Sequence, residues 1–74
     1  MDKIDSVKIY LPKEQREYKV GQSESGYKGE PTVKNISWRS TDGVTILEVI
    51  FEGEKGPDRT LTFHNVPFVC EVPA

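Results

Sequence analysis

Apolar and polar residues alternate along most of the chain, which is the pattern of a β-strand with one buried face. The alternating segments are rich in β-branched and aromatic residues and are separated by glycine, proline and polar residues. They cover residues 6–11, 17–20, 32–40, 44–52, 59–64 and 67–72. No segment shows a helical period. The pattern therefore predicts an all-β fold, a small antiparallel barrel or a two-layer sandwich of five to six short strands.

The dipeptide Asp42-Gly43 lies between two alternating segments and is typical of a two-residue type I′ turn. Such a turn places Thr41 opposite Val44. Following the two strands away from the turn gives three further pairs: Trp38 with Leu47, Ile36 with Val49, and Lys34 with Phe51. The apolar members of these pairs share one face, so turn chemistry and apolar pattern predict the same register, and a slip of one residue would separate them.

The next connection, residues 53–58, contains two glycines and a proline. Matching the apolar faces across it pairs Phe51 with Leu61 and Val49 with Phe63. The predicted core row consists of Ile36, Trp38, Leu47, Val49, Phe51, Leu61 and Phe63. Residues closing over it are expected from the first two strands (Val7, Ile9, Leu11, Tyr18, Val20) and from the last (Phe68, Cys70, Val72). If Trp38 is buried there, its replacement by alanine would cost roughly 3–5 kcal/mol.

The chain has 74 residues, of which 35% are hydrophobic. This length allows a single domain, residues 1–74, with a thin core, and excludes a large cofactor-binding enzyme. No segment approaches the ~18 apolar residues of a membrane helix, so no membrane partner is expected. The net charge of −2 is too small to indicate a dedicated polyanion or polycation partner.

The chain contains one cysteine, Cys70, which cannot form an internal disulfide. Small secreted domains usually carry several cysteines, and the first residues lack the apolar segment of a signal peptide. These features predict a soluble, cytoplasmic protein. Cys70 itself is expected to be a small buried hydrophobe on a strand rather than a reactive thiol.

Candidates for chemistry are few. The predicted registers place Ser37, Glu48 and His64 in one row across three strands, but the carboxylate stands between the hydroxyl and the imidazole, which would be about 9–10 Å apart. The row is better explained as a polar stripe on a solvated sheet face. One His and one Cys offer no metal-ligand spacing, and no glycine-rich phosphate-binding motif is present. We therefore predict no catalytic residues, no metal and no cofactor, and do not expect an enzyme.

The face opposite the predicted core carries four apolar residues on the central hairpin. They are Val33, Val44, Ile46 and Ile50. An exposed apolar patch on a small domain usually marks an interface. The alternative is that the first, second or last strand covers this face in a two-layer sandwich, and the pattern leaves both open.

The segment 21–31 is a long loop for a compact domain, and such loops are often functional. Tyr27, between Gly26 and Gly29, has the character of an aromatic interface anchor. The alternative is a mobile loop whose tyrosine has no role.

These features support a non-enzymatic module that binds another protein or a second copy of itself, as an accessory or inhibitory protein. The alternative is a small β-barrel that binds single-stranded nucleic acid through basic side chains and an exposed aromatic ring. Its candidate residues are Lys8, Tyr10, Lys19, Lys34 and Arg39. The slightly acidic composition argues against this alternative, because nucleic-acid-binding domains are usually clearly basic.

Overall fold

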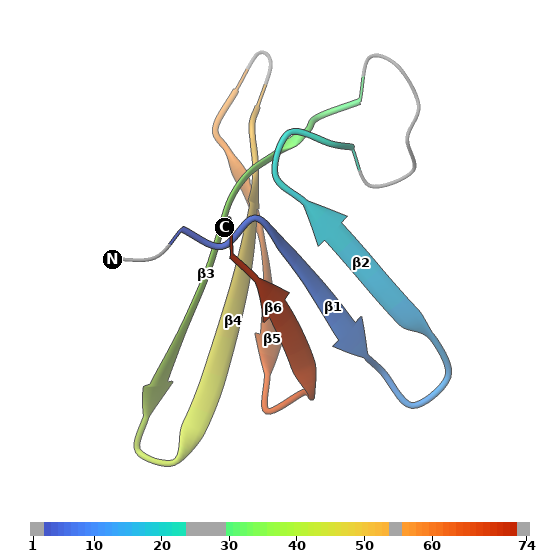
Figure 1. Cartoon of the computed structure of the whole chain (residues 1–74). Coiled ribbons are helices and arrows are strands. Elements are labelled where there is room, and N and C mark those ends of the chain that lie inside the picture. Colours follow the sequence, from blue (N-terminus) through green and yellow to red (C-terminus); the bar gives the residue numbers. More distant parts are fainter. Residues whose placement is uncertain (1–2, 24–29, 54–55, 73–74) are drawn as a thin grey trace.

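A computed structural model of the chain describes residues 3–23, 30–53 and 56–72. The six strands are β1 (Ser6–Tyr10), β2 (Gln15–Lys19), β3 (Val33–Thr41), β4 (Val44–Phe51), β5 (Arg59–His64) and β6 (Phe68–Glu71). They form two antiparallel sheets of three strands, in the orders β2-β1-β6 and β3-β4-β5 (Figure 1). The all-β prediction is confirmed, and of its two forms the structure adopts the sandwich-like one rather than a closed barrel.

The core lies between the two sheets. Its buried hydrophobic residues are Val7, Ile9 and Tyr18 from the first sheet and Val33, Ile36, Leu47, Val49 and Phe51 from the second. The first sheet therefore covers the face that carries Leu47 and Val49, as predicted for Val7, Ile9 and Tyr18, whereas Val20 and Val72, also expected to close over that row, are exposed. Tyr18 meets Phe51 edge-on across the interface, with 5.9 Å between ring centroids.

The hairpin of β3 and β4 has the predicted register from Thr41 opposite Val44 to Ile36 opposite Val49. Asp42 and Gly43 have φ values of 52° and 79°, as a type I′ turn requires. The predicted pair of Lys34 with Phe51 is wrong. A β-bulge between Val33 and Asn35 places Val33 opposite Phe51 instead.

The bulge has a physical cause at the corner where β2 leads into β3. The backbone nitrogen of Val33 donates to the carbonyl oxygen of Gln22 at 2.9 Å, and its carbonyl oxygen accepts from Gly21 N at 2.8 Å. Gly21 has a φ of 90°, which favours glycine. Held in this way, Val33 turns inward and is 2% exposed, so the expectation that it lies on the outer face is also wrong.

The register of β4 with β5 differs from the predicted one by two residues: Val49 lies opposite Leu61, and Leu47 opposite Phe63. Both registers put the same apolar residues on the same face, so the apolar pattern cannot distinguish them. Contacts in the connection favour the observed register. The Asp58 carboxylate accepts a hydrogen bond from Gly53 N at 3.1 Å, and the Arg59 guanidinium lies 4.9 Å from the centroid of the Phe51 ring.

The connection from β5 to β6 is tied to the start of β4 by Asn65. Its backbone nitrogen donates to the carbonyl oxygen of Thr45 at 2.8 Å, and its side-chain oxygen accepts from Thr45 N at 2.9 Å. Asn65 has a φ of 54°, which asparagine tolerates better than most residues. These two hydrogen bonds fix the short connection in which the chain passes from one sheet to the other.

Candidate functional site

An apolar groove opens between the free edges of β3 and β6. It has a volume of about 590 Å³, and its apolar wall consists of Ile4, Ile36, Trp38, Cys70 and Val72. Both are edge strands of the sheets that the structure describes: β6 pairs with β1, and β3 pairs with β4, with an isolated bridge of Val33 to Val20 at the start of its other side. The groove is therefore bounded on two sides by backbone at the margin of a sheet.

Trp38 is the main aromatic group of this groove. The sequence predicts it in the core, but its side chain is 53% exposed, so that prediction is wrong. The register explains why: Trp38 lies opposite the buried Leu47, yet β3 has no further strand beyond it to cover the other half of the indole. Its ring contacts Phe68 of β6, at 6.1 Å between centroids and 61° between planes.

Cys70 lies on the opposite wall of the groove. It is opposite Val7 in the register of β1 with β6, and it is partly buried. Burial raises the pKa of the Cys70 thiol, because the thiolate loses its hydration there. The sulfur is therefore a neutral, weakly polar part of an apolar wall at neutral pH, in keeping with its predicted role as a small hydrophobe.

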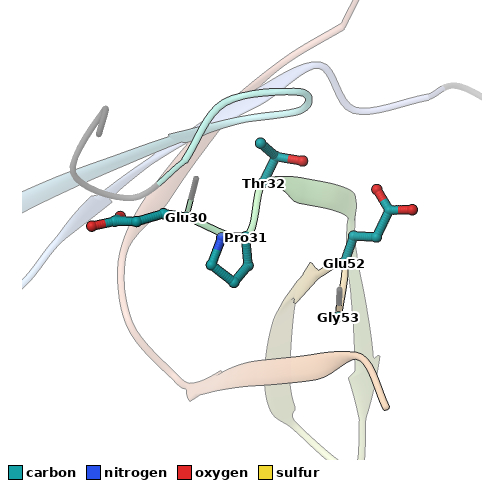
Figure 2. A pocket seen from close by; sticks show the side chains of 5 residues that line it. All are labelled: Glu30, Pro31, Thr32, Glu52 and Gly53. Carbon is teal, nitrogen blue, oxygen red and sulfur yellow. The ribbon is translucent and has the colours of Figure 1, made fainter. Parts of the chain in front are cut away.

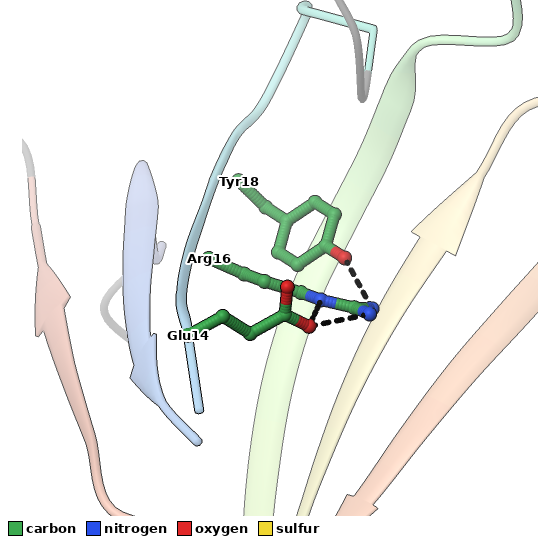
Figure 3. A network of polar contacts seen from close by, with 3 residues as sticks. All are labelled: Glu14, Arg16 and Tyr18. Atoms are coloured by element: carbon green, nitrogen blue, oxygen red, sulfur yellow. Dashed lines mark hydrogen bonds and ion pairs between the residues drawn. The ribbon is translucent and has the colours of Figure 1, made fainter. Parts of the chain in front are cut away.

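A polar network lies at β2 and the residue before it, where it lines a hollow of about 370 Å³. Figure 3 shows Glu14, Arg16 and Tyr18 with their side chains pointing from β2 toward the second sheet. Arg16 Nε donates to Glu14 Oε1 at 2.8 Å, and Arg16 Nη1 donates to the Tyr18 hydroxyl at 3.5 Å. These hydrogen bonds, first to Tyr18 and then to Glu14, raise the pKa of Arg16. One margin of the sandwich is thus lined by polar side chains, whereas the groove at Trp38 is mainly apolar.

A smaller hollow of about 270 Å³ lies where β3 begins and β4 ends. Figure 2 shows its lining, Glu30, Pro31, Thr32, Glu52 and Gly53, with the two carboxylates pointing in different directions. Catalysis by paired carboxylates or metal binding would need them to converge. Among the residues that the structure describes, no group of three or more His, Cys, Asp or Glu side chains is placed to hold a metal ion.

The predicted row of Ser37, Glu48 and His64 is not formed. Ser37 lies opposite Glu48, but Glu48 lies opposite Thr62, and His64 lies opposite Ile46. The two-residue difference in the β4–β5 register displaces the histidine. The Glu48 carboxylate instead forms an ion pair with Arg39 of the neighbouring strand.

Of the five predicted interface residues, three lie on one face. Val44, Ile46 and Ile50 are half-buried on the outer face of β4, with Glu48 between the two isoleucines. Val33 is in the core. Tyr27 lies outside the described residues. The outer face of β4 is therefore an interrupted apolar row rather than a continuous patch.

The five candidate nucleic-acid-binding residues lie on opposite sides of the sandwich. Lys8, Tyr10 and Lys19 are exposed on β1 and β2, with Lys8 opposite Glu17 in the register. Lys34 and Arg39 lie on β3 and form ion pairs with Asp58 and Glu48. The structure does not assemble these five side chains into one basic surface.

Comparison with known protein families, with curated proteins and with solved structures finds no match to this chain. The described part of the chain contains no helix with the length and apolar character needed to cross a membrane.

The groove at Trp38 was missed by the sequence analysis. The signal for it in the sequence was an aromatic residue, Trp38, in a strand to which the pattern assigned a neighbouring strand on one side only.

Proposed function

We propose that this chain is a non-enzymatic protein-binding module that takes an extended apolar segment of a protein into the groove at Trp38. The observation that carries the proposal is the half-exposed indole of Trp38 in an apolar groove between two free strand edges. Tryptophan is enriched among the residues that dominate binding energy at protein interfaces.

The groove suits an extended chain because both of its margins are strand edges. A segment laid along either edge forms backbone hydrogen bonds, and its alternate side chains enter the apolar space, as in strand addition to a sheet. The apolar wall of Ile36, Trp38 and Val72 supports apolar side chains at the positions that point inward.

The distribution of charge supports a protein rather than a nucleic acid as the partner. Arg39 and Lys34, the cations of β3, are already held in ion pairs with acidic side chains of this chain. The single thiol of Cys70 suits a reducing compartment, and we place the protein in the cytoplasm as an accessory or inhibitory factor.

A linear peptide library displayed on phage tests the proposal. Peptides are selected on the wild-type protein, and their binding is then compared with Trp38→Ala and with Val69→Ala as a matched control. Val69 is 55% exposed, close to the value for Trp38, but its position in β6 is on the outer face of the other sheet. We expect peptides with alternating apolar residues that bind wild type and Val69→Ala equally and Trp38→Ala at least roughly tenfold more weakly. Peptides that bind all three proteins equally would contradict the proposal.

A further inference from the structure

β3 is the longest strand of the structure and forms one edge of its sheet. In a hairpin with a two-residue turn, the residues that flank the turn form a hydrogen-bonded pair, and hydrogen-bonded pairs then alternate along the strands. Counting from Thr41, the residues of β3 that direct backbone N–H and C=O groups away from β4 are Ile36, Trp38 and Ser40. Two of these three residues line the groove.

This edge lacks the protection that charged side chains usually give to an edge strand. Free lysines at an edge oppose pairing with another chain. The charged residues of β3 are Lys34 and Arg39. Lys34 Nζ lies 2.9 Å from Asp58 Oδ2, and Arg39 forms an ion pair with Glu48, so both cations are neutralised within the chain. The charged residues of β3 itself therefore do not oppose the approach of a second β3 edge; Lys3 of the N-terminal segment also lines the groove.

We infer that the occupant of the groove is a second copy of this chain, with two β3 strands paired antiparallel about a twofold axis at Ser37. The inference rests on the proposed function, since it names the partner at the same groove. The pairing extends β3-β4-β5 into a continuous six-stranded sheet with a self-complementary interface.

The register follows from the side chains of β3. With Ser37 opposite Ser37, the remaining pairs are Ile36 with Trp38, Asn35 with Arg39 and Lys34 with Ser40. Each exposed indole then lies beside an isoleucine of the other copy, and no like charges are opposed. A displacement by one residue would set inward-facing residues opposite outward-facing ones. A shift of the axis to Ile36 would set Lys34 opposite Trp38, and a shift to Trp38 would set Ile36 opposite Ser40.

A disulfide trap tests the axis. At Ser37 the two copies form a non-hydrogen-bonded pair with Cα atoms about 4.5 Å apart, which is within the range for a disulfide. The variant Ser37→Cys is made in a Cys70→Ala background, and Thr62→Cys in the same background is the control. Thr62 is in the same row of the same sheet face but on the other edge strand. We expect the Ser37→Cys protein to form a covalent dimer at least roughly tenfold faster than the control under mild oxidation. Equal rates would overturn the inference.

Sedimentation of the wild-type protein over a concentration series gives a second measurement. Because Trp38 is the single tryptophan, its emission should shift to shorter wavelength as the dimer forms and the indole is covered. We expect Trp38→Lys to remain monomeric at concentrations where the equally exposed Val69→Lys is dimeric. A dimer that Trp38→Lys leaves intact would overturn the inference.

The two proposals fail separately. A wild-type protein that is monomeric at every concentration but binds the selected peptides at Trp38 overturns the second-copy inference and leaves the protein-binding function in place. A monomer that also binds no peptide at Trp38 overturns both. A dimer trapped at Ser37 supports both, because the groove is then occupied by protein.

Discussion

The indole of Trp38 meets the ring of Phe68 edge-on between the two sheets, 6.1 Å from centroid to centroid. This contact joins the edge strand of one sheet to the edge strand of the other and covers one side of Trp38. The other side is open, and the indole is 53% exposed. One residue thus contributes to the sandwich interior and also leaves part of an aromatic surface exposed.

The stability effect of Trp38 should reflect this half-burial. We expect Trp38→Ala to lower the free energy of unfolding by about 2 kcal/mol, below the ~3–5 kcal/mol of a fully buried aromatic residue. Leu47→Ala, at the fully buried position opposite, should cost roughly 2–5 kcal/mol and leave a cavity. Urea denaturation followed by circular dichroism measures both. A Trp38→Ala protein that fails to fold would show that the indole belongs to the core.

The turn between β3 and β4 should depend on Gly43 for its backbone conformation. Gly43 has a φ of 79° and no atom within 4 Å of an added Cβ, so any cost of Gly43→Ala comes from backbone strain rather than a clash. We expect a loss of about 1–2 kcal/mol in the free energy of unfolding. Gly56→Ala is the control, because its added Cβ also meets open space and its φ is not in the left-handed region. Equal effects of the two substitutions would contradict the type I′ assignment.

The ion pair of Asp58 with Lys34 should make the fold sensitive to acid. The hydrogen bond from Lys34, and next the one from Gly53 N, lower the pKa of Asp58 from its ordinary value of 3.8. The unfolded chain therefore binds the proton more readily. The carboxylate stabilises the fold above pH 3.8, and this contribution is lost as the pH falls through the lower folded-state pKa.

Asp58→Asn should therefore flatten the acid limb of the stability–pH profile, and Lys34→Gln, which removes the principal partner, should do so in part. Denaturation at a series of pH values measures the slope. Because both side chains are exposed, added salt should weaken the wild-type contribution. An Asp58→Asn protein with the wild-type slope would show that the pair does not influence stability.

The thiol of Cys70 should react slowly with a disulfide reagent such as Ellman's reagent. Its raised pKa reduces the thiolate fraction at neutral pH, and the groove wall partly covers the sulfur. Thiol release followed by absorbance measures the rate. The control is the exposed thiol of Thr62→Cys in the Cys70→Ala background, which should react several-fold faster. Occupation of the groove should slow Cys70 further, whereas equal rates for the two thiols would contradict its placement in the wall.

Local features of the chain were predictable because they depend on neighbours in sequence. Alternation of apolar residues identified all six strands, and Asp42-Gly43 set the register of β3 with β4 as far as Ile36. The outward position of Tyr10 also follows from alternation, and its side chain is 37% exposed. In each case the feature is determined by a few consecutive residues.

The errors arose where distant segments meet. The bulge at Val33 depends on hydrogen bonds with Gly21 and Gln22, which the strand itself does not encode. The β4–β5 register depends on Asp58 and Arg59, because an apolar pattern with a period of two looks the same after a shift of two residues. These contacts join separate segments of the chain, and the alternation of apolar residues within one segment does not predict them.

The groove at Trp38 likewise combines a feature that the sequence predicts with one that it does not. From the sequence alone, Trp38 is an inward-facing residue of a strand paired with Leu47, and this is correct. Whether it is covered depends on which strands are edges and how the two sheets are offset, and the tertiary structure alone decides this. The sequence by itself determined the strands, the two-residue turn and, apart from the bulge at Val33, the face on which the side chains of the central hairpin lie. The packing of the sheets decided which of those faces is left open, because burial depends on contacts between residues far apart in the chain.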